Sequence, residues 1–173
     1  SPREICFFGG SFCRFGFSKV KEYLDSVANN APEGSRIRFS TYPGDLGSRP
    51  MMDLIKEYPI ACIELGIPSL EPSVLSICKR DAEPGAILDD IKGITDEGLP
   101  LGVQIMIGLP GQTMESSLAD IRKMADVKGP LSWDLRLYPC LVLEGTELDK
   151  MMEVKDFVPL TLEQAFSRGG IVL

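Results

Sequence analysis

An apolar run near the start of the chain ends abruptly at two glycines, in the stretch ICFFGGSF. Gly9 and Gly10 carry no side chain at the point where a buried strand would end. Such a pair is compatible with a tight turn, and it also lets a ligand approach the backbone closely. The stretch alone leaves both interpretations open, so other segments must decide between them.

Four further segments place small, polar or charged residues directly after an apolar run. They are FSTYP (39–43), ELGIPS (64–69), QIMIGLPGQT (104–113) and RLYPCLVLEGT (136–146). In parallel α/β folds, ligands gather at the carboxyl ends of the strands. The five segments together therefore define a candidate binding site.

One carboxylate stands inside an apolar run and needs an explanation. Glu64 would be buried there, and a buried carboxylate requires a partner. Arg38, Arg80 or Arg136 could supply the opposite charge. A structural ion pair and a ligand contact both remain open.

Several kinds of chemistry are excluded. GLPGQT resembles half of a phosphate loop, but Gln112 stands where a Walker A motif has lysine, so no nucleoside-triphosphate site is expected. The chain has no histidine, which excludes histidine triads, histidine bases and histidine metal ligands. Its five cysteines contain no C-x-x-C, which excludes zinc ribbons and dithiol redox motifs. No metal ligand and no catalytic residue is assigned.

The composition is that of one ordinary globular domain. The chain has 173 residues, 44% of them hydrophobic and 25% charged. No apolar run has the length of a membrane-spanning helix, and the N-terminal segment lacks a signal-peptide layout, so a cytoplasmic protein without membrane contact is expected. The net charge of −7 lacks the basic footprint of a free-standing nucleic-acid binder.

The elements that position these segments alternate along the chain. Five apolar runs predict strands at Ile5–Phe8, Arg36–Ser40, Ala61–Gly66, Leu101–Ile107 and Trp133–Pro139. Apolar residues at helical spacing lie between them. Alternating strands and helices are typical of a parallel α/β protein. The strands look apolar almost throughout, as expected when helices cover both faces of the sheet.

Signals for helix ends support this pattern. Ser18 is expected to cap one helix and Gly98 to follow the end of another. The stretch Thr161–Gln164 is a capping box, yet Gly169 and Gly170 are expected to interrupt the helix that it announces. Neither end is typical of a natural domain edge, so we expect truncation at both.

Taken in order, these segments resemble the core of a radical S-adenosylmethionine (SAM) enzyme. The resemblance is carried by FFGGSF, RFSTYP, IELGIPSLEPSVLSICKR, GVQIMIGLPGQT, RLYPCLVLEGTEL and VPLTLEQA. The chain is most similar to the branch of the catalytic subunit of the elongator complex, and oxygen-independent coproporphyrinogen oxidase is a more distant relative. The resemblance implies a partial (β/α)6 TIM-like barrel of parallel strands that lacks the first βα unit. Residues 1–173 would form a single incomplete core domain containing strands two to six.

The resemblance also implies a binding site for SAM. Gly9 and Gly10 would let the backbone meet the amino group of SAM, with Ser11 beside them. Ser40 and Thr41 would face its methionine or ribose part. The other cofactor-binding positions that the resemblance implies are Glu64, Arg80, Gln104, Ile107, Gly108 and Tyr138.

Some of these positions carry more specific expectations. Arg80 would pair with the carboxylate of SAM, and Ile107 and Gly108 would lie along its adenine. The sequence departs from the family at Pro68, which replaces a glutamine, and at Tyr42, which replaces an arginine. The change at Pro68 removes a polar side-chain contact that the family makes with the ribose of SAM.

The motif C-x-x-x-C-x-x-C, whose thiolates hold the family's [4Fe–4S] cluster, is absent. Its ligands are therefore expected upstream of this chain. The complete enzyme would be an oxidoreductase that cleaves SAM reductively to a 5′-deoxyadenosyl radical, which takes hydrogen from a substrate. This chain alone would supply the SAM-binding wall and is expected to be inactive. The substrate is unknown; tRNA and a small metabolite are the candidates.

Two alternatives remain. The chain could be a relative without a cluster that binds a ligand or regulates a partner. It could also be an unrelated α/β-barrel enzyme for a phosphorylated metabolite. An incomplete barrel that lacks its first strand would leave the edge of the second strand open, so self-association through that edge is expected.

Overall fold

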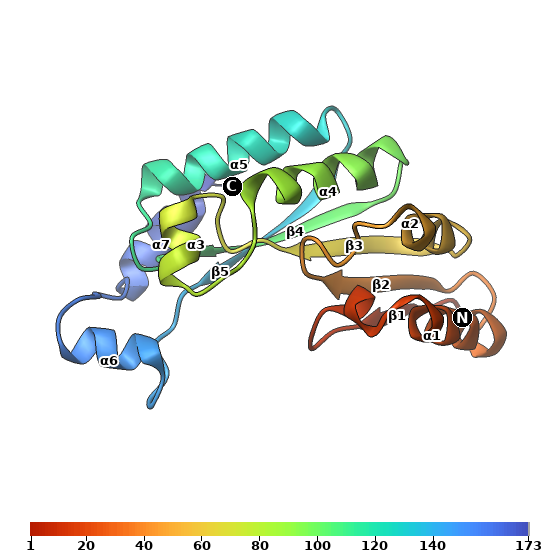
Figure 1. Cartoon of the computed structure of the whole chain (residues 1–173), viewed down its shortest axis with the longest axis horizontal. Coiled ribbons are helices and arrows are strands. Elements are labelled where there is room, and N and C mark those ends of the chain that lie inside the picture. Colours follow the sequence, from red (N-terminus) through yellow and green to blue (C-terminus); the bar gives the residue numbers. More distant parts are fainter. Residues whose placement is uncertain (173) are drawn as a thin grey trace.

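The computed structural model describes residues 1–172 and contains a five-stranded parallel sheet (Figure 1). Its strands are β1 (Glu4–Phe7), β2 (Arg36–Thr41), β3 (Ile60–Gly66), β4 (Leu101–Ile107) and β5 (Trp133–Pro139). They pair in the order of the sequence, so β1 and β5 form the two open edges of the sheet. The predicted α/β class with parallel strands is confirmed, and the bounds of β4 and β5 are those expected.

Helices follow the strands in alternation, as the apolar periodicity predicted. They are η1 (Phe12–Phe15), α1 (Phe17–Asn30), α2 (Arg49–Lys56), α3 (Pro72–Ile77), α4 (Pro84–Asp96), α5 (Met114–Lys128), α6 (Glu147–Glu153) and α7 (Leu162–Val172). The short 3-10 helix η1 was not expected. Among the described helices, none combines the length and the hydrophobicity needed to cross a lipid bilayer.

The helix ends confirm some sequence signals and overturn others. Gly98 follows α4 with a φ of 68° and closes the helix end, as expected. The Thr161 and Gln164 capping box also forms, with bonds of 2.9 and 3.2 Å. Ser18, however, lies inside α1, whose N-cap is Gly16. Gly169 and Gly170 do not interrupt α7, which continues to Val172.

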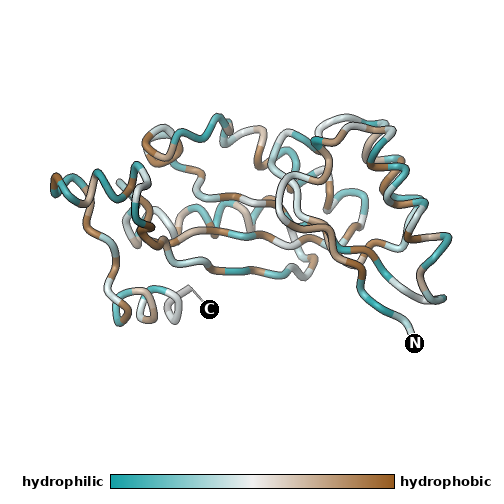
Figure 2. Tube along the Cα trace, turned by 90° about the horizontal axis from the view of Figure 1, so that it is seen from below, coloured by the Kyte–Doolittle hydropathy of each residue, from teal (hydrophilic) through white to brown (hydrophobic). Residues whose placement is uncertain are grey.

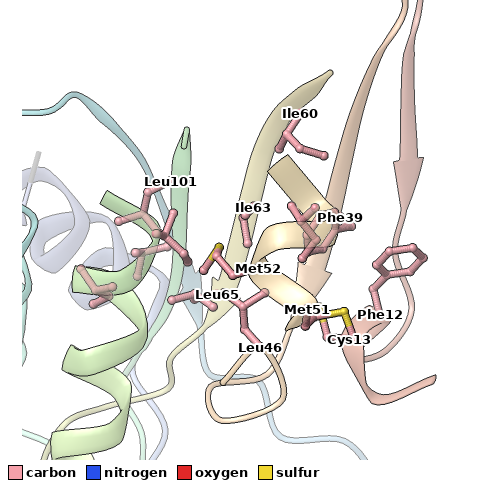
Figure 3. Packing of buried hydrophobic residues seen from close by; sticks show 14 of the residues in the cluster. Phe12, Cys13, Phe39, Leu46, Met51, Met52, Ile60, Ile63, Leu65 and Leu101 are labelled. Carbon is pink, nitrogen blue, oxygen red and sulfur yellow. The ribbon is translucent and has the colours of Figure 1, made fainter. Parts of the chain in front are cut away.

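The apolar core lies on one face of the sheet, beneath α1, α2, α4 and α5. Phe39, Ile63 and Leu65 project from the strands into this layer and are fully buried (Figure 3). They pack with residues such as Leu24 of α1 and Ile91 of α4, which are equally buried. Burial of this continuous layer is the main source of the stability of the fold.

The opposite face of the sheet is polar, which corrects the prediction that helices cover both faces. Hydropathy alternates along the strands because neighbouring residues point to opposite faces (Figure 2). The exposed fractions of the side chains of Asp134 and Arg136 are 58% and 41%. Charged residues at alternate positions of β2 and β5 therefore mark a face that the described helices leave partly exposed.

Candidate functional site

The carboxyl ends of the strands border an open hollow of about 670 Å³. A hollow of this size is in the range of small-molecule sites. Eight predicted site residues line it: Gly9, Gly10, Ser11, Ser40, Thr41, Arg80, Gln104 and Tyr138. The structure thus brings together residues that are up to 129 positions apart, since Gly9 and Tyr138 both line the hollow. Their roles toward a cofactor stay predictions.

The two glycines after β1 present bare backbone to open space. Gly9 adopts a φ of 98°, a conformation that favours glycine. A Cβ atom added to Gly9 or Gly10 would meet no heavy atom within 4 Å. The backbone conformation thus accounts for glycine at position 9, whereas neither conformation nor packing requires glycine at position 10, where room for a ligand would explain it.

Ser11 uses its hydroxyl within the protein. The hydroxyl donates to Asp45 Oδ2 and accepts from the backbone N–H of Tyr42 at 2.9 Å. It also lies 3.0 Å from Thr41 Oγ1. Arg14 pairs with the same Asp45 carboxylate at 3.0 Å. Ser11 therefore ties the loop after β1 to the end of β2, and its hydroxyl is already occupied.

Glu64 forms a structural ion pair. Its side chain is 1% exposed, and its Oε1 lies 2.7 Å from Arg38 Nη1 and 3.0 Å from Arg136 Nη2. Gln104 donates to the other oxygen, Oε2. Two of the three arginines proposed as partners are correct, and Arg80 makes no such pair. Glu64 lies beneath the hollow and is absent from its lining.

Arg38 links this carboxylate to the strands at both sides. Its guanidinium also bonds to Glu4 at 2.6 Å and to Asp134 at 3.2 Å. Burial would lower the pKa of Arg38, but the hydrogen bonds to Glu64 and Glu4 outweigh it and raise the pKa. The network spans β1, β2, β3 and β5, so it ties the strands together below the hollow.

Ile107 and Gly108 lie outside the hollow, although both were expected along a ligand. Ile107 is buried at 3% exposure. A Cβ atom on Gly108 would lie 2.6 Å from Cδ1 of Leu160, which precedes α7. The segment before α7 therefore covers this part of β4, a contact between distant segments that the sequence pattern does not reveal.

Four charged residues of the lining were not predicted: Arg14, Lys79, Asp81 and Arg136. Arg136 could have been found from its position in β5, since it stands opposite Gln104 in the register of the sheet. Lys79 stands beside Arg80, in one of the two pairs of adjacent basic residues in the sequence. Cations thus dominate the charged lining of the hollow.

Asp120 of α5 accepts hydrogen bonds from the loop that follows β3. Its Oδ2 accepts from Ser69 Oγ at 2.7 Å and from the backbone N–H of Leu70 at 2.9 Å. Its Oδ1 is buried and has no partner among the described residues. Burial raises the pKa of Asp120. The loop that carries Pro68 is therefore anchored by a buried acid.

The residues of the hollow fit SAM but offer nothing to an iron–sulfur cluster. Bare backbone at Gly9 and Gly10, together with the guanidinium of Arg80, suits an amino acid ammonium and carboxylate. Within residues 1–172, no group of three or more His, Cys, Asp or Glu side chains could hold a metal ion. Cys13 and Cys62 are buried, which raises the pKa of their thiols to about 12 and about 11.

Comparison with known proteins gives relatives in both sequence and structure. No protein-family model matches the chain. A tRNA uridine(34) acetyltransferase from Methanocaldococcus infernus is 30% identical over 103 residues, which are 60% of this chain and 19% of that protein. The structure of Elp3 from the same archaeon, with an N-terminal deletion, matches with a TM-score of 0.73 at 22% identity. That match covers 94% of this chain and 43% of Elp3.

A second structure extends the likeness. Coproporphyrinogen III oxidase (HemN) from Escherichia coli, a radical SAM enzyme, matches with a TM-score of 0.72 at 13% identity. The match covers 97% of this chain and 38% of HemN. The chain thus spans less than half of either structure and about a fifth of the curated relative. At these identities, the likeness to the two structures is one of fold.

Proposed function

We propose that the chain, which has the fold of the radical SAM core, forms the SAM-binding wall of a radical SAM enzyme. This fold is the one predicted by the resemblance to the elongator-like and coproporphyrinogen oxidase branches. The observation that carries this proposal is the hollow at the carboxyl ends of the strands, with the bare backbone of Gly9 and Gly10 facing it. Ligands of parallel α/β proteins bind at this edge of the sheet.

Each part of the hollow has a role in the proposal. The carbonyl groups next to Gly9 and Gly10 accept hydrogen bonds from the SAM ammonium, and Arg80 pairs with its carboxylate. Ser40, Thr41 and Tyr138 border the rest of the ligand. When bound, SAM supplies a sulfonium whose reductive cleavage is the chemistry of this family. We place the ligands of the iron–sulfur cluster upstream of Ser1, because the described residues offer none.

The proposed substrate is a tRNA. The curated relative is named a tRNA uridine(34) acetyltransferase, and the chain shares 30% identity with part of it. The cations in the lining of the hollow provide local positive charge on a chain with a net charge of −7. These cations suit a nucleic acid that inserts one nucleotide into the hollow while other parts of the enzyme bind the rest of the RNA.

Binding of SAM to the chain tests the proposal. Gly10 lies outside the positive-φ region, so Gly10→Val adds a side chain to the hollow without straining the backbone. We expect the variant to bind SAM at least about tenfold more weakly in isothermal calorimetry, equivalent to about 1.4 kcal/mol. Its melting temperature should match that of the unchanged chain, since a Cβ atom at this position meets no neighbour within 4 Å.

The control is Gly85→Val in α4, which also adds atoms to open space but lies away from the hollow. This variant should bind SAM as the unchanged chain does. Equal SAM affinity in both variants, or no SAM binding by the unchanged chain, would contradict the proposal.

A further inference from the structure

Lys79 occupies a backbone conformation that favours glycine. It follows α3 and its C-cap Cys78, with a φ of 53°. The turn is closed by the N–H of Lys79 on the Ser76 carbonyl at 3.0 Å and that of Arg80 on the Leu75 carbonyl at 2.9 Å. A residue with a Cβ atom is strained in this left-handed conformation, and glycine is the usual residue at such helix ends.

The same turn after α4 carries the expected glycine. Gly98 has a φ of 68°, and the N–H groups of Gly98 and Leu99 close the helix end with the same two bonds. The local geometry therefore does not require lysine at position 79. Backbone strain that is retained at a cleft is a reason to look for a role of the side chain.

Lys79 and Arg80 are the two cations of the lining that no close carboxylate holds among the described residues. Arg14 and Arg136 are each held by a carboxylate at 3.0 Å. Lys79 has only a loose partner, Glu147 Oε2 of α6, at 3.7 Å from its Nζ, and the lysine side chain is 76% exposed. Such exposed pairs contribute little and exchange readily for another anion.

We propose that Lys79 binds a backbone phosphate of an RNA substrate at the mouth of the hollow. The inference rests on the proposed function in taking the hollow as the active-site cleft, and it adds a residue that contacts the substrate outside the cofactor site. Arg80, the next residue, stays with the carboxylate of the cofactor, whereas Nζ of Lys79 lies outward, beside α6. One ammonium group on a chain of net charge −7 suits a single local phosphate contact.

Lys155 provides a matched control. It follows α6 with a φ of 60°, and the N–H groups of Lys155 and Asp156 close the turn at 3.0 and 2.8 Å. It is exposed and does not belong to the lining of the hollow. Lys79 and Lys155 are the two described residues other than glycine with a positive φ, so both changes to glycine relieve the same strain.

The test measures the affinity of the chain for an RNA stem-loop with a uridine in its loop, by fluorescence anisotropy over a range of salt concentrations. Lys79→Gly and Lys155→Gly should both raise the melting temperature, by about 2–4 °C. Only Lys79→Gly should weaken binding, and it should reduce the slope of log K against log salt by about 0.7–0.9, the loss of one phosphate contact. Glu147→Gln removes the carboxylate that pairs with Lys79 and should strengthen binding of the RNA.

An unchanged slope in Lys79→Gly, or no RNA binding by the unchanged chain, overturns the proposal. A loss of slope in Lys155→Gly equal to that in Lys79→Gly overturns it as well. SAM affinity of the unchanged chain, measured in parallel, tests the proposed function separately. A chain that binds RNA through Lys79 but binds no SAM would contradict the proposed function alone.

Discussion

At the scale of single residues, Asp120 should make the free energy of unfolding depend on pH, because its buried Oδ1 has no partner among the described residues. The folded chain buries Asp120, and burial raises its pKa above that of the unfolded chain. The folded state therefore holds this proton more tightly than the unfolded state. The stability that Asp120 contributes is fully present below the unfolded pKa and is lost as the pH rises through the folded pKa.

Asp120→Asn removes this dependence while keeping an oxygen that can accept from Ser69 and Leu70. We expect the melting temperature of the variant, relative to the unchanged chain, to increase as the pH rises from 4 to 7. Thermal melts at several pH values measure this difference. Asp126→Asn controls for the loss of a charge, because Asp126 is exposed on the same helix. A difference that does not change with pH would contradict the role given to Asp120.

The charged network shows where reasoning from the sequence succeeds and where it stops. Glu64 stands out in the sequence as a carboxylate in a strand, and two of its three suggested partners are correct. The role of the pair was left open, because one charge in an apolar run does not reveal whether its partner is an arginine or a ligand. Its geometry comes from the register of β2, β3 and β5, which sequence patterns do not specify.

At the scale of elements, capping residues distinguish true helix starts from apparent ones. Thr113 Oγ1 accepts a hydrogen bond from the N–H of Ser116 at 3.1 Å, and Ser116 Oγ accepts one from the N–H of Thr113 at 3.0 Å. Thr113→Ala should cost about 1 kcal/mol, which lowers the melting temperature by about 2–4 °C. Differential scanning calorimetry measures the shift.

Ser18→Ala is the matched comparison, because the sequence predicts Ser18 as a cap and the structure places it inside α1. A surface change of this kind should alter stability by less than about 0.5 kcal/mol. Equal losses in Thr113→Ala and Ser18→Ala would show that the structural assignment of the caps is wrong.

The elements were predictable where a periodic pattern decides them. Apolar runs located all five strands, because such runs between helical segments have few alternatives in a globular protein. The polar face was missed although Arg36 and Arg38, and likewise Asp134 and Arg136, alternate visibly along β2 and β5. Parallel strands place their carboxyl ends together, so much of the candidate site could be predicted. The contact of Leu160 with Gly108 could not be predicted from the sequence, since it depends on the path of a long loop.

At the scale of the whole molecule, the free edge of β1 lies beside an apolar hollow. This second hollow, of about 330 Å³, is lined by aromatic residues that include Phe8, Phe15 and Tyr23. Phe8 and Phe15 are 53% and 63% exposed. An unpaired strand edge next to exposed aromatic side chains favours association with another chain.

Sedimentation velocity over a range of concentrations should therefore show self-association of the chain. Phe8→Lys should shift the equilibrium toward the monomer, because a charge at the edge opposes pairing. Val158→Lys is the control, since Val158 is 80% exposed and does not line either of the two hollows. A chain that is monomeric at all concentrations, or an equal effect of both substitutions, would contradict this expectation.

The order of the strands in the sheet has a consequence for synthesis. Because β1 to β5 pair in the order of the sequence, each new strand meets its partner among residues that the ribosome has already released. None of the five described strands is inserted between two strands that precede it in the sequence. The sheet can therefore grow from the N-terminal side one unit at a time, and an interruption of translation leaves a shorter sheet with its pairs intact.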